Sequence, residues 1–404
     1  MEQLQKLTNT AAAAPLITLL LPPNAIAAPQ ASHTLSTPIS ASWKAVDGLN
    51  SLESNNKFVS FNDSAYQAMI NDPSRTPLFE KAIINRLQSS STQGNGGNPG
   101  NQVVLDLGTG PYAYFAIVAA KHGAGKVYAI EASKEAAASA RTAVQKAGYD
   151  DKITILEGFS TDITLPDGIK ADFAIAEIVG SVASEEGVIA TILDAHERLL
   201  KNPNDATSWI PNRIQTFAAP ASYSLHNLFK PPAFDWTKLN GEPVRFNCRD
   251  EGLQLLSEPV LVEDISFPDM IEFGNKGRLS KEQRRISFTV DGKRIDENVQ
   301  KFNNEYTRGR VPDADNLAYV AAHSVSGIAL WPRLLLDNDV QINSRHYPDG
   351  AHQRSHWQTV LPIMSPEPVA VNGGDEIIVN FEFDISPEVT TPSSYKISGN
   401  VVSK

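Results

Sequence analysis

Two glycines follow an apolar run, and their turn is the first place where the sequence could bind a ligand. The run covers residues 103–107 and includes Asp106, and Gly108 and Gly110 come directly after it. Glycine lets a backbone approach a ligand where a side chain would clash. The last glycine of the G-x-G-x-x-G dinucleotide motif is absent, because Ala113 stands there. The turn predicts either a cofactor with a nucleoside part or an ordinary strand–turn–helix without a ligand.

Two acidic residues narrow the choice of cofactor. Glu131 ends the next apolar run, and an acid at that place in a doubly wound sheet hydrogen-bonds ribose hydroxyls. A nicotinamide cofactor and S-adenosylmethionine both carry such a ribose. Asp106 favours S-adenosylmethionine, because its carboxylate would repel a pyrophosphate but attract the ammonium of a methionine group. We therefore expect S-adenosylmethionine as the cofactor.

Composition limits the class of protein. The chain has 404 residues with a formal net charge of −11, which argues against nucleic-acid binding by bulk charge and suits a cationic substrate. The single cysteine, Cys248, excludes an intramolecular disulfide and a cysteine-based zinc site. No run reaches the ~18–20 apolar residues of a membrane span. We expect a cytoplasmic protein with no metal site and with neither nucleic acid nor membrane as a partner.

Strand-like and helical patterns alternate in the first half of the chain. The strand-like runs are residues 103–107, 126–130, 153–156 and 173–176, and the helical patterns are residues 114–122, 134–146 and 185–200. This alternation predicts a parallel sheet covered by helices on both faces. Asp106 and Glu131 would then lie near the carboxyl edge of the sheet, where ligands bind.

After residue 209 the pattern changes to short strand-like runs separated by Pro, Asn, Asp and Gly, which indicates antiparallel structure. One such run is residues 319–321, and the charged stretch at residues 291–315 is expected to be a solvated insertion. The fold class is therefore α/β, with a Rossmann-like domain followed by an antiparallel β-barrel domain. The predicted parts are a disordered or mobile tail at residues 1–55, a S-adenosylmethionine-binding domain at residues 56–209 and a substrate-binding β-barrel at residues 210–404.

Five stretches, in order along the chain, resemble motifs of the protein arginine methyltransferases, a branch of the class I S-adenosylmethionine-dependent methyltransferases. They are residues 69–76 (MINDPSRT), 104–110 (VLDLGTG), 127–133 (VYAIEAS), 176–186 (AEIVGSVASEE) and 355–357 (SHW). The glycine motif is common to many methyltransferases, whereas the last two stretches together are much more specific.

The sequence also departs from the family pattern. Tyr112 stands where a third glycine of the turn is usual. Ile178, Val179 and Ser181 replace the tryptophan, methionine and tyrosine of the family's double-glutamate loop. These departures concern the choice of substrate more than the reaction.

The resemblance implies how the cofactor is bound. Arg75 would hold the carboxylate of S-adenosylmethionine, Glu131 its ribose, and Phe159 and Ser160 would flank its adenine. The residues expected to bind the cofactor are Arg75, Asp106, Gly108, Gly110, Glu131, Phe159 and Ser160.

The resemblance also implies the catalytic groups. Glu177 and Glu186 would clamp a guanidinium, which is planar, cationic and rich in N–H donors. Glu185 competes with Glu186 for this role. His356 would pair with Asp72, either to take up a proton or to brace the site. The expected catalytic residues are Glu177, Glu186, His356 and Asp72.

The leading interpretation is an arginine-type N-methyltransferase that acts on an arginine-containing protein or on a small molecule such as free arginine, and the resemblance implies a possible homodimer. The alternative enzyme is a small-molecule N- or O-methyltransferase of secondary metabolism on the same scaffold. A third interpretation is a catalytically inactive partner subunit, against which both glutamates and the histidine argue.

Overall fold

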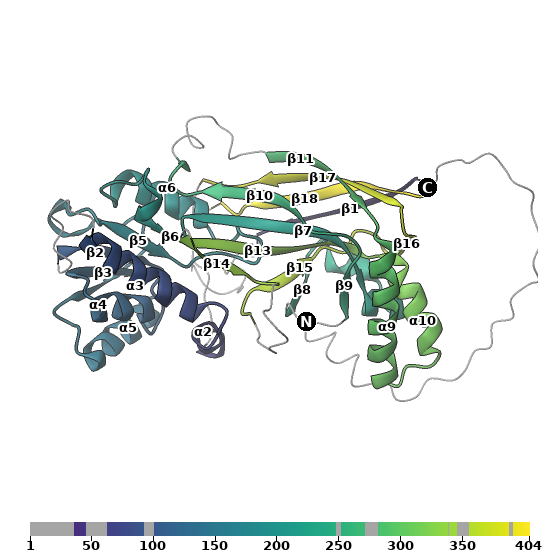
Figure 1. Ribbon diagram of the computed structural model, residues 1–404, viewed down its shortest axis with the longest axis horizontal. Coiled ribbons are helices and arrows are strands. Elements are labelled where there is room, and N and C mark those ends of the chain that lie inside the picture. Colours follow the sequence, from purple (N-terminus) through teal and green to yellow (C-terminus); the bar gives the residue numbers. More distant parts are fainter. Residues whose placement is uncertain are drawn as a thin grey trace, which may run out of the picture. The chain divides into compact units, whose positions relative to one another are not determined.

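A computed structural model describes residues 36–45, 63–92, 101–247, 252–270, 282–337, 339–345, 355–387 and 391–404. Residues 35–404 form one compact unit, in which a parallel sheet with helices and an antiparallel region can be distinguished (Figure 1). Most of the predicted tail (residues 1–35 and 46–55) and Cys248 lie outside the described residues. No helix in the described ranges is both long enough and apolar enough to cross a membrane.

The parallel sheet has five strands in the order β4-β3-β2-β5-β6, and all neighbours are parallel. Its strands are β2 (Val103–Leu107), β3 (Lys126–Glu131), β4 (Ile153–Glu157), β5 (Phe173–Ala176) and β6 (Trp209–Ile210). Its helices are α2 (Asp63–Ile70), α3 (Thr76–Thr92), α4 (Tyr114–Lys121), α5 (Lys134–Ala147) and α6 (Val188–Arg198), with short 3-10 turns η2 (Pro166–Gly168) and η3 (Ala206–Ser208). The predicted Rossmann-like half is confirmed.

Local sequence explains where these elements start and stop. β2, β3 and β5 are buried almost throughout, as expected for central parallel strands with both faces covered. Ser133 caps α5 by accepting the N–H of Ala136, and Gly148 ends the helix in the left-handed conformation. The turn after β3 is thereby fixed, which holds Glu131 at the edge of the sheet.

The antiparallel region contains sheets of seven, four and two strands, and confirms the predicted barrel-like half. The seven-stranded sheet has the order β10-β7-β13-β15-β8, with β14 on β13 and β9 on β7; the four-stranded sheet is β1-β18-β17-β11. The strands are β1 (Ser36–Lys44), β7 (Arg213–Tyr223), β8 (Val244–Asn247), β9 (Leu253–Leu255), β10 (Val260–Ser266), β11 (Glu282–Thr289), β12 (Ser324–Val325), β13 (Gly327–Asp337), β14 (Val340–Asn343), β15 (Gln358–Leu361), β16 (Val369–Ala370), β17 (Glu376–Asp384) and β18 (Ser394–Val402). α7 (Ser224–Leu228) and η4 (Trp236–Leu239) follow β7. The predicted domain boundary at residues 209 and 210 stays a prediction, because both regions belong to one compact unit.

Strand β1 corrects the prediction of a mobile tail over residues 1–55. β1 pairs with β18 along its full length. Ile39, Ala41 and Trp43 are buried, while the residues between them are exposed. This alternation with period two is the signal of a half-buried strand, and the Ser- and Pro-rich composition around it outweighed that signal in the sequence analysis.

Two helices correct two predictions in the second half. α9 (Gly292–Arg308) occupies most of the stretch expected to be a solvated insertion, and it buries Ile295, Phe302 and Tyr306. α10 (Ala314–Ala322) contains residues 319–321, for which a strand was predicted. Ala318 and Ala321 are buried in α10, which packs against α9. The tertiary contact therefore outweighs the strand propensity of a short Tyr-Val-Ala run.

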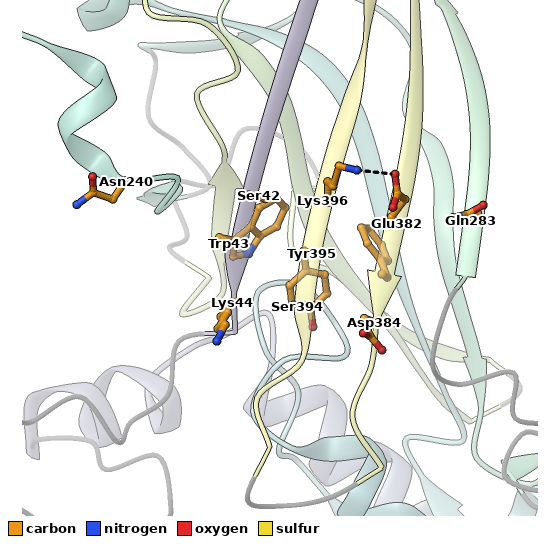
Figure 2. Close-up of a pocket in the computed structure, with 11 residues that line it drawn as sticks. Ser42, Trp43, Lys44, Asn240, Gln283, Glu382, Asp384, Ser394, Tyr395 and Lys396 are labelled. Atoms are coloured by element: carbon orange, nitrogen blue, oxygen red, sulfur yellow. Dashed lines mark hydrogen bonds and ion pairs between the residues drawn. The ribbon is translucent and has the colours of Figure 1, made fainter.

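Two cavities lie along the edge strand β1. The first has a volume of about 530 Å³ and is lined by residues of β1, β11, β17 and β18, with Lys396 Nζ 3.0 Å from Glu382 Oε1 (Figure 2). The second, about 430 Å³, shares Ser42, Asn240 and Lys396 with it. None of the described residues that line them belongs to the predicted site.

Candidate active site

The glycine turn closes tightly against the loop that follows β5. Gly108 and Gly110 have positive φ angles of 72° and 66°, which non-glycine residues rarely adopt. A Cβ atom on Gly108 would lie 2.7 Å from Cγ2 of Ile178. The isoleucine that replaces the family's tryptophan therefore packs directly on the turn.

Asp106 and Glu131 lie at the carboxyl edge of the sheet, as predicted. The Asp106 side chain is buried and accepts a hydrogen bond from the Thr109 hydroxyl at 2.6 Å. Burial raises the pKa of Asp106 to about 6, although the Thr109 bond opposes the shift. Glu131 accepts the N–H groups of Gly110 and Ser133, each at 2.8 Å, and burial raises its pKa as well. The two carboxylates thus border the glycine turn on adjacent strands.

Phe159 and Ser160 follow β4 at the same edge of the sheet. The N–H of Gly158 donates to the carbonyl of Glu131 at 2.9 Å, which joins this turn to the end of β3. The carbonyl of Ser160 is fixed by Arg198 at 3.0 Å. The position agrees with contact to a cofactor, and the role in binding adenine stays a prediction.

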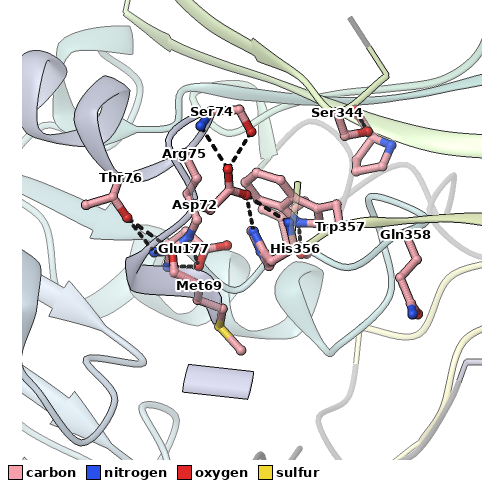
Figure 3. Close-up of polar contacts among 12 residues, drawn as sticks. Met69, Asp72, Ser74, Arg75, Thr76, Glu177, Ser344, His356, Trp357 and Gln358 are labelled. Atoms are coloured by element: carbon pink, nitrogen blue, oxygen red, sulfur yellow. Dashed lines mark hydrogen bonds and ion pairs between the residues drawn. The ribbon is translucent and has the colours of Figure 1, made fainter. Parts of the chain in front are cut away.

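Arg75 contacts Glu177, a pair that the sequence analysis did not anticipate (Figure 3). Its Nε donates to Glu177 Oε2 at 2.9 Å, and Nη2 bonds to the same oxygen. Its guanidinium also packs 5.0 Å from the ring centre of Phe115. Both partners are buried, with side chains 8% exposed. Glu177 therefore already binds a guanidinium in this structure, and its carboxylate is oriented by that bond.

Asp72 and His356 form the expected pair (Figure 3). Asp72 Oδ2 accepts from the His356 backbone N–H at 2.8 Å and lies 3.0 Å from Nδ1, while Ser74 bonds to Oδ1. Burial would raise the pKa of Asp72, but the bonds from His356 and Ser74 hold it below its usual value. Burial lowers the pKa of His356. The pair is then an ionised Asp72 and a neutral His356 that donates from Nδ1, which leaves Nε2 as a proton acceptor.

The double-glutamate loop, residues 177–187, is anchored by the antiparallel region. The indole N–H of Trp357 donates to the carbonyl of Val179 at 2.8 Å, and the N–H of Gln358 donates to the Ser181 hydroxyl at 3.0 Å. Two of the departures from the family pattern, Val179 and Ser181, are therefore contact points for Trp357 and Gln358, which directly follow His356.

Glu185 and Glu186 have different environments, which separates the two candidates for the second clamp residue. Glu185 is 3% exposed and forms a two-pronged ion pair with Arg245, at 2.8 and 3.2 Å. Glu186 is exposed and has a positive φ of 66°, a strained conformation for a glutamate. Within the described part of the chain it has no hydrogen bond or ion pair. The geometry favours Glu186 as the second clamp residue.

The ionisation of Glu186 is perturbed. Loss of hydration, followed by the like charges of Glu177 and Glu185, raises the pKa of Glu186 to about 8, and Arg245 opposes this. Because the side chain reaches solvent, we attribute the larger share of the shift to the two carboxylates. A carboxyl group whose pKa is strongly shifted, in a loop beside a second carboxyl group, is typical of a functional site.

Three residues that hold the loop were not predicted from the sequence. They are Arg245, Thr216, whose hydroxyl accepts the N–H of Ala183 at 2.9 Å, and Tyr395, whose hydroxyl lies 2.8 Å from that of Ser184. None of them stands in a motif, and only proximity in the fold identifies them. No three His, Cys, Asp or Glu side chains gather to hold a metal ion in the ranges that the structure describes.

Comparisons with known proteins point in one direction. Residues 54–207 match the family model described as PRMT5 arginine-N-methyltransferase. Protein arginine N-methyltransferase PRMT10 of Arabidopsis thaliana is 37% identical over 170 residues, which are 41% of this chain and 42% of that protein. Protein arginine N-methyltransferase 7 of Gallus gallus is 30% identical over 174 residues, 41% of this chain and 24% of that protein. The chain therefore matches less than half the length of these curated relatives.

The fold extends the likeness beyond the matched segment. The structure of Arabidopsis thaliana protein arginine methyltransferase 10 aligns with a TM-score of 0.56 at 18% identity, over 83% of this chain and 97% of that chain. The Trypanosoma brucei PRMT1 enzyme–prozyme complex with AdoHcy aligns with a TM-score of 0.57 at 17% identity, over the same shares. Residues 54–207 are therefore similar to the arginine methyltransferases, and the chain shares their fold beyond that segment.

Proposed function

We propose that the protein transfers a methyl group from S-adenosylmethionine to a guanidinium nitrogen of arginine in a protein substrate. The observation that carries the proposal is the bond between Glu177 and the Arg75 guanidinium. Glu186, in the same loop, has no partner among the residues that the structure describes. The comparisons give no support to free arginine or to another small molecule as the substrate.

The residues at the carboxyl edge of the sheet fit S-adenosylmethionine. The buried Asp106 carboxylate suits an ammonium, the Glu131 carboxylate suits ribose hydroxyls, and the Gly108 turn leaves no room for a side chain. When bound, the cofactor would supply a methyl group on a positively charged sulfur. The AdoHcy in the Trypanosoma brucei complex agrees with this choice.

The chain's own residues would position the guanidinium and handle its proton. Glu177 and Glu186 would accept N–H bonds from two nitrogens and draw positive charge towards them, so that the third nitrogen keeps electron density for attack. Most of the rate gain would come from this positioning. The attacking nitrogen gains the methyl group and loses a proton, and the neutral His356 at Glu177 can accept it on Nε2 while Asp72 stabilises the resulting charge.

The contact between Arg75 and Glu177 implies an order in which cofactor and substrate bind. Arg75 occupies Glu177, so a substrate guanidinium must compete with it. A carboxylate arriving beside Arg75 with the cofactor would give that side chain a second anionic partner. We expect the cofactor to bind first for this reason.

The test is methyl transfer from isotopically labelled S-adenosylmethionine to arginine-rich peptides, free arginine and a panel of small amines. Label on peptide arginine, seen as a ~14 Da mass shift, supports the proposal. Label on small molecules alone, or cofactor binding without any transfer, contradicts it. Glu177→Gln is the control, because it should abolish transfer while calorimetry still detects binding of S-adenosylhomocysteine.

A further inference from the structure

The double-glutamate loop contains three carboxylates and two arginine partners. Arg75 pairs with Glu177 and Arg245 pairs with Glu185. Glu186 follows Glu185 directly and has no partner among the described residues. The loop therefore keeps one carboxylate whose negative charge no arginine balances, and this charge matches the single positive charge of a substrate guanidinium.

Arg245 reaches the loop from the antiparallel region. It lies on β8, opposite Val360 of β15, and β15 begins directly after His356 and Trp357. One pair of antiparallel strands thus delivers both Arg245 and the His356 segment to the loop. Nη2 lies 2.8 Å from Glu185 Oε1 and Nη1 lies 3.2 Å from Oε2, the geometry in which arginine fixes a carboxylate most firmly.

The backbone around Glu185 leaves it little freedom. Its Oε2 also accepts the N–H of Val182 at 3.1 Å. A Cβ atom on Gly180 would overlap with the Cβ of Glu185, so only glycine allows the loop to fold back there. Once Glu185 is held inward, the left-handed conformation of the next residue places Glu186 in solvent.

A buried aromatic stack supports the same stretch from the four-stranded sheet. The Tyr395 hydroxyl lies 2.8 Å from the Ser184 hydroxyl, and both residues are buried. Trp43 of β1 stacks on Tyr395 with ring centres 5.3 Å apart (Figure 2). Ser184 and Glu185 are thus both fixed by the antiparallel region, directly before Glu186.

We propose that Arg245 is a positioning residue that binds and neutralises Glu185, and thereby reserves Glu186 for the substrate guanidinium. The proposal rests on the proposed function. Arg245 acts on Glu186 in two ways, through the loop backbone and through its charge. The other groups that face the site are Glu177 and Glu185 on the loop, Arg75 and His356 at Glu177, and Tyr395 at Glu185. Glu263 faces Tyr395 from the strand behind it.

The charge of Arg245 opposes the two neighbouring carboxylates, which together raise the pKa of Glu186. Removing that charge should raise the pKa further and move the acid limb of kcat/KM to higher pH. A residue that only supports the fold would not shift this limb, so the pH profile separates the two roles.

The experiment compares Arg245→Met, Arg245→Lys and the double variant Arg245→Met/Glu185→Gln with the wild type. Arg213→Met is the matched control, because Arg213 binds both oxygens of Asp264 in the same sheet, away from the loop. The readouts are melting temperature, Kd for S-adenosylhomocysteine, and KM and kcat/KM for an arginine peptide from pH 6 to pH 10.

Arg245→Met should raise KM at least tenfold, about 1.4 kcal/mol, and shift the acid limb upward, with the Kd for S-adenosylhomocysteine within about twofold. Arg245→Lys should keep the limb near its wild-type position, and the double variant should bring it back, because one positive and one negative charge are then removed together. Arg213→Met should change neither KM nor the limb.

Two results would overturn the proposal. One is an Arg245→Met enzyme with the KM and pH profile of the wild type. The other is an Arg245→Met enzyme that loses stability, cofactor affinity and activity together at every pH, with the same losses in Arg245→Lys. If the wild type methylates no arginine peptide, the proposed function fails by itself, and the proposal is then decided by an NMR titration of Glu186: an equal pKa in wild type and Arg245→Met refutes it.

Discussion

The parallel and the antiparallel regions contribute to the site in different ways. The parallel region provides the groups at strand ends: Asp106, Glu131 and the loop that carries Glu177 and Glu186. The antiparallel region provides the side chains that hold this loop, from strands far apart in the sequence. The family-model match covers residues 54–207, where the strand-end groups stand. The matched segment thus contains the proposed carboxylates, whereas the antiparallel region supplies His356 and the side chains that hold the loop.

The largest expected effect falls on the parallel side. Glu186→Gln keeps the size of the side chain but removes the charge that should bind the guanidinium. A charge-assisted hydrogen bond that strengthens in the transition state contributes roughly 3–4 kcal/mol, so kcat/KM should fall about 10²–10³-fold. Steady-state kinetics with an arginine peptide measures this.

Glu185→Gln is the matched control for that prediction, because it changes the neighbouring carboxylate that Arg245 already binds. Its loss should be at least tenfold smaller. Equal losses in the two variants would show that the exposed and buried glutamates do not have separate roles.

Asp106→Asn should separate function from stability. Burial raises the pKa of Asp106 from 3.8 to about 6, so the folded protein holds this proton more tightly than the unfolded chain. The stability from the protonated form is therefore lost as pH rises from about 4 to 6, and the charged form destabilises the protein above that range. At pH 7.5 asparagine should raise the free energy of unfolding by about 1–3 kcal/mol.

The same variant should weaken S-adenosylmethionine binding about 100-fold, because the charge that suits its ammonium is lost. Thermal unfolding without ligand and calorimetry with ligand measure the two effects. A less stable variant, or one that binds the cofactor normally, would remove Asp106 from the proposed cofactor site.

Asp72→Asn tests the contact that crosses between the regions. The ionised Asp72 selects the His356 tautomer with its proton on Nδ1, and an amide could instead donate to Nδ1 and reverse the tautomer. We expect kcat to fall about tenfold or more, with the Kd for S-adenosylhomocysteine within about threefold. Ser74→Ala removes only the hydroxyl bond to Asp72 and should reduce kcat less than threefold; similar losses would indicate a general disturbance of the loop.

Several features of the site were predictable from short segments of sequence. Asp106, Gly108 and Glu131 stand at the ends of apolar runs with clear period and length, so a parallel sheet places them at one edge. Arg245 carries no such signal, because a single arginine on an alternating strand is indistinguishable from a solvent-facing residue. Its partner Glu185 is separated from it by 60 positions, and only the strand pairing of β8 with β15 makes them neighbours.

The same limit explains the wrong predictions. The segment 36–44 has a clear alternation, but its partner β18 lies at the other end of the chain, so local composition suggested a tail. In α9 the polar face dominates the composition while Phe302 and Tyr306 are buried. Local sequence predicts a helix or strand reliably only when the segment's own pattern shows which side chains are buried. It fails where the burial depends on a partner element far away in the sequence.

The smallest expected effect is on the antiparallel side. Tyr395→Phe keeps the ring stack on Trp43 but removes the hydroxyl from Ser184. Loss of a buried partner costs about 1–2 kcal/mol of folding free energy, and kcat should change less than threefold because Arg245 still holds Glu185. Denaturant unfolding and steady-state kinetics measure the two quantities.

Ser184→Ala provides the test of whether this bond supports the loop. The two hydroxyls are each other's partners, so the double variant should destabilise the protein less than the sum of the single variants, with a coupling of about 0.5–1.5 kcal/mol. Additive losses would mean that the antiparallel region holds the loop without this bond. The anchoring would then depend on Arg245 and Trp357, whose bonds are to Glu185 and to the carbonyl of Val179.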